Sequence, residues 1–211
     1  MKKKIISIVC FLTAAVLLFA SCGNSGAEKT GNDADQSSAS QVSSGNRTKI
    51  LFTMEDGKTF TIALYPEYAP TTCENFESLV KSGFYEGTTF HRVIDGFMAQ
   101  GGGFNTDGSQ KRADSIIGEF ANNGFAQNTL KHKRGTVSMA RTQVPDSASS
   151  QFFICYKDCD FLDGNYAAFG EVTDGMDTVD SFLEVERDID SNGDRSVPLT
   201  PIVIKSAEVI S

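Results

Sequence analysis

The sequence has little of the material from which most catalytic centres are built. Its 211 residues include no Trp and only two His, His91 and His132. The chain contains no G-x-S-x-G, phosphate-loop or H-E-x-x-H motif, and Gly101, Gly102 and Gly103 lack the spacing of a dinucleotide-binding loop. An enzyme built from this sequence is therefore expected to need no covalent intermediate, no metal and no cofactor.

Positive charge is also scarce. Asp and Glu number 27 against 19 Lys and Arg, so the formal net charge is −8 at pH 7. Removal of Lys2, Lys3 and Lys4, which precede the apolar run described below, makes the net charge −11. Such a surface repels the phosphates of nucleic acids and of anionic lipids. We therefore expect no nucleic-acid partner.

A largely apolar run of 15 residues, 5–19, follows these lysines. A helix that spans a bilayer needs about 20 apolar residues, so the shorter run predicts a signal peptide over residues 1–21. The residues from Leu18 to Cys22 resemble the lipobox of bacterial lipoproteins, in which the Cys is lipidated and becomes the N-terminus, although Phe19 departs from the usual aliphatic residue. The alternative is an ordinary secretory signal in which Cys22 is incidental.

The segment that follows contains almost nothing to bury. Residues 23–46 include one large aliphatic side chain, Val42, among Gly, Ser, Asn, Asp, Gln and Ala. Such a composition predicts a disordered tether over residues 22–46 and one folded domain over residues 47–211. We expect the domain to lie outside the cytoplasm, anchored to a cell membrane by more than one acyl chain on Cys22.

Three cysteines remain in the predicted domain: Cys73, Cys155 and Cys159. Their spacing fits neither C-x-x-C nor a metal site, although a bridge between Cys155 and Cys159 is possible. We favour the interpretation that Cys73 and Cys155 are small buried hydrophobic residues.

The domain alternates short apolar strands with few helices. Residues 49–65 are typical of a hairpin that turns at Asp56 and Gly57, and residues 70–83 of an amphipathic helix. A second helix is predicted over residues 174–183, with Met176, Val179 and Leu183 on its buried face, and a closing strand over 202–210. Many strands with two helices predict a mostly β fold, a closed antiparallel barrel capped by the two helices.

Two segments combine polar residues with Phe and Met. In residues 90–102, Met98 and Gln100 share one face of a strand, while Arg92 lies across the turn at Asp95 and Gly96. Residues 138–141 and 149–154 predict a second strand pair. From composition alone, the simpler interpretation is that these aromatic stripes are core.

These segments resemble the cyclophilin-type peptidyl-prolyl cis-trans isomerases. F-H-R-V-I-D-G-F-M-A-Q-G-G-G-F (90–104) is similar to the family's signature, and S-M-A-R-T (138–142), S-Q-F-F-I (150–154) and F-L-D-G-N-Y-A-A-F-G (161–170) follow in the family's order. The resemblance covers residues 49–210. It implies an isomerase that rotates X-Pro bonds. Together with the predicted anchor, we expect it to assist the folding of exported proteins, as a monomer that acts on proline-containing polypeptides.

The resemblance also implies roles for individual residues. It places the catalytic Arg at Arg92, with Gln100 orienting it, and lines the proline pocket with Phe97, Met98, Phe153 and Leu162. Gln151 matches a polar wall, and the groove for the preceding residues matches Ala140, Arg141 and Thr142. Phe161, Tyr166 and Arg141 replace the Trp, His and Asn of the best-known eukaryotic members, and Phe161 lacks the indole N–H that binds cyclosporin.

Two other interpretations stay open at this stage. The protein could be a binding module or holdase that grips proline-containing segments with little turnover, because Arg141 and Tyr166 reshape the groove. Residues 188–194 resemble the start of an EF-hand loop, but Leu199 occupies the position that requires Glu, so an acidic turn is the favoured interpretation. His91 is assigned no proton transfer, because the corresponding His is structural in the family.

Overall fold

The computed structural model describes residues 47–210; the predicted signal peptide, the predicted lipidation site at Cys22 and the predicted tether lie outside the described residues. In chain order the elements are β1 (Lys49–Met54), β2 (Thr59–Leu64), α1 (Pro70–Lys81), β3 (Thr88–Ile94), β4 (Met98–Asn105), η1 (Ala121–Asn123), β5 (Thr136–Met139), β6 (Phe152–Cys155), η2 (Asp160–Leu162), β7 (Ala168–Asp174), α2 (Met176–Ser181), η3 (Phe182–Glu184), β8 (Arg187–Ile189), β9 (Arg195–Pro198) and β10 (Ile202–Val209).

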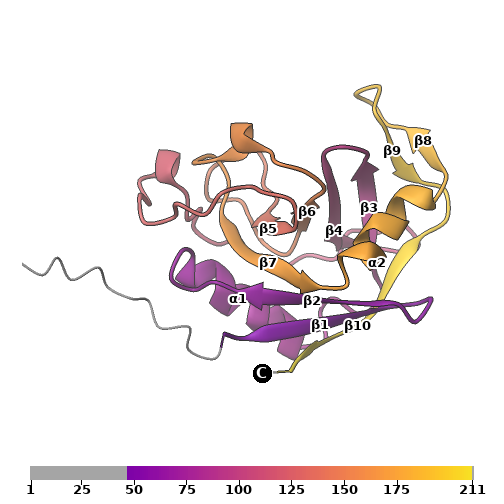
Figure 1. The fold of residues 1–211 in the computed structure, drawn as a ribbon, viewed down its shortest axis with the longest axis horizontal. Helices are drawn as coiled ribbons and strands as arrows, with labels where there is room; N and C mark the ends of the chain where they lie inside the picture. The colour runs from indigo at the N-terminus through magenta and orange to yellow at the C-terminus, as the bar shows by residue number, and fades with distance from the viewer. Residues whose placement is uncertain (1–46, 211) are drawn as a thin grey trace, which may run out of the picture. The chain divides into compact units, whose positions relative to one another are not determined.

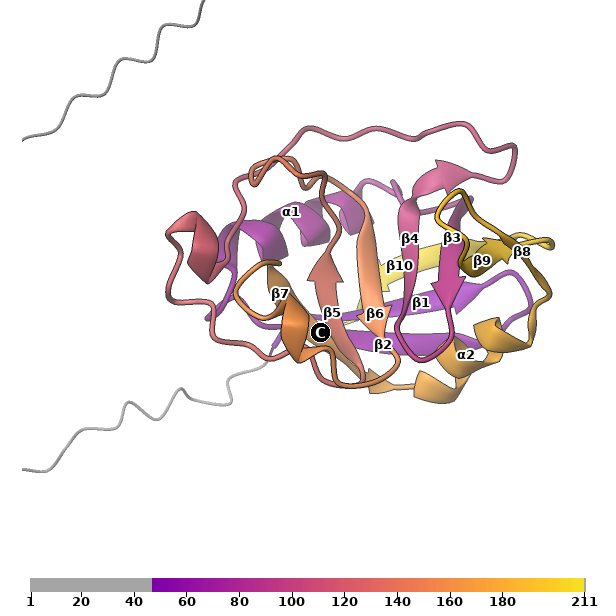
Figure 2. The same cartoon turned by 90° about the horizontal axis from the view of Figure 1, so that it is seen from above.

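Eight of the strands close into an antiparallel barrel in the order β1-β10-β3-β4-β6-β5-β7-β2 (Figure 1). Closure removes the unpaired strand edges on which aggregation begins. Helix α1 contacts β10, α2 contacts β2, and Figure 2 shows the two helices on opposite sides of the strands. The predicted fold class is therefore confirmed. The remaining strands, β8 and β9, form a separate hairpin that lies beside β3.

The first hairpin forms where the alternation of apolar residues predicts it. Gly57 has a φ of 85°, a conformation that glycine adopts without strain, and so closes the turn between β1 and β2. Phe52 pairs with Phe60 across the strands, and their rings stack with centroids 4.9 Å apart. Because both side chains point into the barrel, this pair fixes the register of the hairpin.

Helix α1 receives its N-terminal cap from a distant loop. The buried carboxylate of Glu119, between β4 and β5, accepts hydrogen bonds from the backbone N–H groups of Thr71 and Thr72 at 2.9 and 2.8 Å, and from the Thr72 hydroxyl at 2.7 Å. A negative charge at this end also complements the helix dipole. The long β4–β5 loop is thereby held against α1.

The second helix is shorter than the predicted span of 174–183. Strand β7 continues through Asp174, Gly175 turns the chain with a φ of 73°, and α2 begins only at Met176. After Ser181 the chain tightens into η3, which rotates the buried face. Val179 is buried as predicted, while Met176 and Leu183 are only partly buried and pack against the core.

Aromatic side chains fill the inside of the barrel. Seven are at most 1% exposed: Phe52, Phe60, Phe76, Tyr85, Phe90, Phe152 and Phe169. A smaller apolar cluster lies apart from this core and contains Met98, Phe153, Cys155, Cys159 and Leu162. Phe152 and Phe153 belong to different clusters because successive side chains of a strand point to opposite faces.

The three cysteines of the described residues are free thiols in buried positions. This confirms the interpretation of Cys73 and Cys155 as small buried hydrophobic residues, and burial raises the pKa of Cys73 to about 12. Between residues 47 and 210, no helix is long and apolar enough to cross a membrane.

Candidate active site

Three neighbouring strands carry the central residues of the site in one row. Arg92 on β3 pairs with Gln100 on β4, and Gln100 pairs with Phe153 on β6. Paired residues in adjacent strands point to the same face of the sheet, so the three side chains stand together on the outside of the barrel. The β4–β6 pairing therefore joins the two sequence segments that combine polar residues with Phe and Met.

A pocket of about 190 Å³ opens over this row. Its lining consists of nine residues named from the sequence: Arg92, Phe97, Met98, Gln100, Ala140, Arg141, Phe153, Leu162 and Tyr166. Larger hollows of about 450 Å³ beside α1 and about 480 Å³ beside α2 are lined mainly by aliphatic and acidic side chains, and neither contains an arginine. The smaller pocket is therefore the candidate site.

The floor of the pocket is apolar. Met98, Phe153 and Leu162 are 2%, 5% and 6% exposed, and Phe97 packs against the same cluster. The ring of Tyr166 meets the ring of Phe153 edge to face, with centroids 5.9 Å apart. Such a lining accepts a small apolar group and excludes water from it.

The other three residues named from the sequence lie outside the pocket lining. The Gln151 carboxamide oxygen accepts a hydrogen bond of 2.9 Å from Gln100 Nε2, so Gln151 supports the polar wall from behind. Phe161 is 68% exposed and lies 5.6 Å from the ring of Phe97. Thr142 is exposed and its hydroxyl pairs with Ser147 at 2.7 Å, away from the pocket.

The tight packing behind Gln151 requires a glycine. A Cβ atom at Gly103 would overlap the Gln151 side chain. Gly103 therefore gives the polar wall room, whereas a Cβ atom at Gly101 or Gly102 would instead meet the core rings of Phe90, Tyr85 and Phe152.

Arg92 is held by two carboxylates that sequence analysis missed. Its Nε lies 3.7 Å from Asp190 Oδ2 and its Nη2 lies 3.6 Å from Asp194 Oδ2. Within residues 47–210 no hydrogen bond joins Gln100 to Arg92; Gln100 donates to Gln151 instead. The acidic segment 188–194 is visible in the sequence, but only the placement of the β8–β9 hairpin beside β3 brings it to Arg92.

Arg141 contributes its side chain as well as its backbone. Its guanidinium lies between the rings of Phe120 and Tyr166, 4.9 and 4.7 Å from their centroids. Its Nε and Nη2 donate to the carbonyl of Asn165 at 3.1 and 2.8 Å. A stacked, bidentate guanidinium is rigid, so Arg141 fixes Tyr166 as one wall of the pocket.

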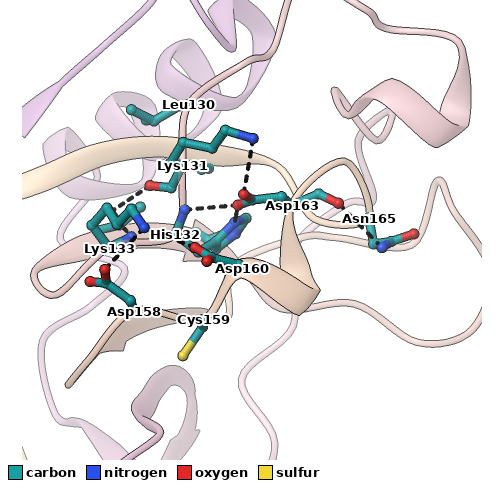
Figure 3. Close-up of polar contacts among 12 residues, drawn as sticks. Leu130, Lys131, His132, Lys133, Asp158, Cys159, Asp160, Asp163 and Asn165 are labelled. Atoms are coloured by element: carbon teal, nitrogen blue, oxygen red, sulfur yellow. Dashed lines mark hydrogen bonds and ion pairs between the residues drawn. The ribbon is translucent and has the colours of Figure 1, made fainter.

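A polar network holds the segment that supplies Leu162 and Tyr166 (Figure 3). Asp163 Oδ1 accepts the backbone N–H of His132 at 2.9 Å and lies 3.0 Å from its Nδ1, while Asp163 Oδ2 pairs with Lys131 at 3.1 Å. Burial lowers the pKa of His132, which favours the neutral ring. Lys133 adds ion pairs to Asp158 and Asp160.

The titratable groups of the site are few. The pKa of Asp190 is lowered first by the hydrogen bond from Ser196 and further by the positive charge of Arg92. In the described part of the chain, no group of three or more His, Cys, Asp or Glu side chains is arranged to hold a metal ion. The pocket thus combines a fixed cation with an apolar floor, which can polarise a bound group.

Comparisons with known proteins identify the family. A family model described as cyclophilin type peptidyl-prolyl cis-trans isomerase/CLD matches residues 49–209. Peptidyl-prolyl cis-trans isomerase A of Dickeya dadantii is 45% identical over 168 residues, which cover 77% of this chain and 85% of that protein. Peptidyl-prolyl cis-trans isomerase B of Escherichia coli is 44% identical over 156 residues, which cover 70% of this chain and 92% of that protein.

A solved structure agrees with the sequence relatives. The crystal structure of a Cryptosporidium parvum cyclophilin type peptidyl-prolyl cis-trans isomerase has a TM-score of 0.63 and 28% identity, and the match covers 79% of this chain and 99% of that one. The barrel, the pocket and these relatives lead to one conclusion. The chain belongs to the cyclophilin-type peptidyl-prolyl cis-trans isomerase family, and it catalyses the cis-trans isomerisation of peptide bonds that precede proline.

Proposed function

We propose that Arg92 is the catalytic residue and that it donates a hydrogen bond to the prolyl nitrogen. Rotation of an amide costs about 18 to 20 kcal/mol because the nitrogen shares its lone pair with the carbonyl. In the twisted transition state this lone pair becomes localised on nitrogen and accepts a hydrogen bond. A guanidinium stays protonated at every relevant pH, so it stabilises the transition state over both planar states.

The remaining pocket residues divide the task of holding the substrate. Phe97, Met98, Phe153 and Leu162 bind the pyrrolidine ring, so that the acyl side rotates against a fixed proline. Gln100 and Gln151 present the polar wall beside Arg92, and the segment Ala140–Arg141 lines the path of the residues before the proline. No bond is made or broken, which agrees with a site that combines only a cation, amides and apolar side chains.

One observation carries this proposal. Arg92 lines the same pocket as the buried side chains of Met98, Phe153 and Leu162. A Cryptosporidium parvum relative was crystallised in the presence of the dipeptide Ala-Pro, which supports an Ala-Pro peptide as the probe. Exchange rates between the cis and trans peptide should be measured by NMR, with and without the protein.

The variant Arg92→Ala should lose about 100-fold or more of the catalysed exchange rate, which is the usual cost of removing a donor to a developing charge. Arg112→Ala is the matched control, because Arg112 is exposed and does not line the pocket. If Arg92→Ala keeps the rate of the control, the role of Arg92 is wrong, although the protein remains an isomerase.

We propose further that the isomerase serves exported proteins from a membrane anchor. The support is the sequence of residues 1–22, with three lysines, an apolar run and a Cys after small residues. Cells fed an azide-tagged fatty acid should label the protein, and Cys22→Ala should lose both the label and the membrane association. Label on the Cys22→Ala variant would contradict lipidation at Cys22.

A further inference from the structure

The β8–β9 hairpin brings a pair of carboxylates to the side of Arg92. In Figures 1 and 2 the hairpin lies against β3, and the segment that joins its strands carries Asp190 and Asp194. Asp190 Oδ2 lies 3.7 Å from Arg92 Nε, and Asp194 Oδ2 lies 3.6 Å from Arg92 Nη2. The hairpin is not part of the barrel, so its contact with the site needs an explanation of its own.

Asp190 is itself fixed in place. Its Oδ1 accepts the backbone N–H groups of Asn192 and Asp194 at 2.8 and 3.1 Å, and its Oδ2 accepts the hydroxyl of the buried Ser196 at 2.8 Å. The Asp190 side chain is only 13% exposed, compared with 48% for Asp194. Asp190 is therefore a rigid anchor, whereas Asp194 adds charge at the rim.

The two carboxylates hold Arg92 without consuming its hydrogen-bonding groups. Hydrogen bonds between a guanidinium and a carboxylate are about 2.7 to 2.9 Å long, shorter than both of these contacts. Within residues 47–210, neither ion pair uses Nη1, and no hydrogen bond to the Arg92 side chain is formed. The N–H groups of Arg92 thus remain available to a substrate in the pocket.

We propose that Asp190 and Asp194 are positioning residues that hold the Arg92 guanidinium in its catalytic orientation. The inference rests on the role proposed above for Arg92. An arginine has many rotamers, and the side chain of Arg92 is 30% exposed, so an unrestrained guanidinium would have to be ordered during each turnover. Carboxylates that orient the guanidinium before the substrate binds lower the entropic cost of reaching the transition state.

Three neighbouring acidic residues allow a matched test. Asp194→Asn removes the charge next to Nη2, and the Asp194 carboxylate has no other polar partner among the described residues. Asp190→Asn keeps an oxygen for the two backbone N–H groups. Asp188→Asn is the control, because Asp188 lies on the same hairpin, is exposed and bonds only to the backbone N–H of Ile189. All three variants lose one negative charge.

The experiment measures kcat and KM by NMR exchange on an Ala-Pro peptide. We expect Asp194→Asn and Asp190→Asn each to lower kcat by about two- to five-fold, and the double variant by about ten-fold, which is the range for partly exposed ion pairs. KM should change little because the apolar floor is intact. Asp188→Asn should match the wild type.

The salt dependence of kcat distinguishes an electrostatic positioning role from a purely structural role of the two carboxylates. The Debye length falls from about 10 Å at 0.1 M to about 3 Å at 1 M, so salt should lower kcat of the wild type and of Asp188→Asn, but not of the double variant. The Nε–Hε NMR signal of Arg92 should shift in Asp190→Asn and stay in place in Asp188→Asn.

The outcomes separate this inference from the proposal on which it rests. If Arg92→Ala is inactive while Asp190→Asn and Asp194→Asn equal the control Asp188→Asn in kcat and salt response, the positioning role is wrong. The role of Arg92 then stands. A rise of kcat in Asp194→Asn would also overturn the inference, because the carboxylates would then compete with the substrate. If Arg92→Ala is fully active, the proposed mechanism itself fails.

Discussion

The inside of the barrel and the outer face of β4 and β6 are built from similar side chains but differ in how completely they are filled. Inside, stacked and edge-to-face aromatic rings leave Phe52, Phe76 and Phe152 without exposed surface. Outside, the smaller cluster around Met98 and Phe153 ends at a pocket of about 190 Å³. The closed interior stabilises the fold, and in the function proposed above the proline of a substrate completes the outer cluster.

Two adjacent residues separate these roles. Phe152 is fully buried inside the barrel, and Phe153, the next residue on β6, lines the pocket. The difference is a consequence of the strand pleat and not of residue type. One step along the chain therefore moves a side chain from the buried core to the pocket, where we propose that it binds the substrate.

The largest expected effects come from removing either ring: one substitution should lower mainly stability and the other mainly activity. Phe152→Ala should lower the free energy of unfolding by about 3 to 5 kcal/mol, as for other buried aromatic residues, while the activity of each folded molecule changes little. Phe153→Ala should cost less stability but lower kcat/KM by about 10- to 200-fold, the range for a changed apolar pocket. Urea unfolding and NMR exchange on both variants measure the two effects.

Each variant is the control for the other, since both delete the same ring from the same strand. If Phe152→Ala loses as much activity per folded molecule as Phe153→Ala, the two clusters act as one unit and the comparison is wrong.

The second prediction concerns the polar side of the pocket. Arg92→Lys should lower kcat by about 30- to 100-fold, because an ammonium lacks the planar fork that can face Asp190, Asp194 and a substrate together. Stability should change by less than about 0.5 kcal/mol, because Arg92 is partly exposed and lies outside the core. Activity equal to that of the wild type would mean that charge alone suffices.

The sequence predicts the local parts of this structure well. Alternation and turn residues identify the hairpin over 49–65, and helical spacing identifies α1, because each pattern depends on neighbours along the chain. The α2 boundaries are less accurate, since Gly175 and the tightening at η3 depend on how β7 ends. Nine of the residues carried over from the family resemblance line the pocket, whereas Gln151, Phe161 and Thr142 lie outside its lining.

The contacts between distant segments could not be predicted in the same way. The β4–β6 pairing joins residues about fifty positions apart, and no local pattern specifies that register. The acidic segment 188–194 is obvious in the sequence, but its partner could not be identified without the position of the hairpin. An isolated acidic segment is compatible with calcium binding, an exposed turn or an ion pair. The fold confirms the favoured acidic turn, closed by hydrogen bonds to Asp190, and adds the ion pairs of Asp190 and Asp194 with Arg92.

The third prediction uses pH to change the stability of the fold without changing the activity of the pocket. Burial lowers the pKa of His91 to about 4, and its Nδ1 has no partner among the described residues. The unfolded chain binds a proton near pH 6.5, so stability is lost as the pH falls from about 6.5 toward 4. Between pH 7.5 and 5.5 His91 should account for about 1 kcal/mol of the loss.

Urea unfolding of the wild type and of His91→Asn at both pH values measures this share, because His132 contributes equally to both proteins. The ring of His91 packs on Phe104 and lines a separate hollow that shares no residue with the pocket. The exchange rate per folded molecule should therefore stay constant over the same range. A His91→Asn variant that loses as much stability as the wild type would show that His91 is not the titrating group.

The smallest effect is expected at the rim, where the outer cluster meets water. Phe161 is 68% exposed and touches the pocket only through Phe97, so Phe161→Ala should change the free energy of unfolding by less than about 0.5 kcal/mol and raise KM about two-fold. Leu199→Ala is the control, since Leu199 is 57% exposed and does not line the pocket. A loss as large as that of Phe153→Ala would place Phe161 in the proline pocket itself, and the boundary between floor and rim would then lie one side chain farther out.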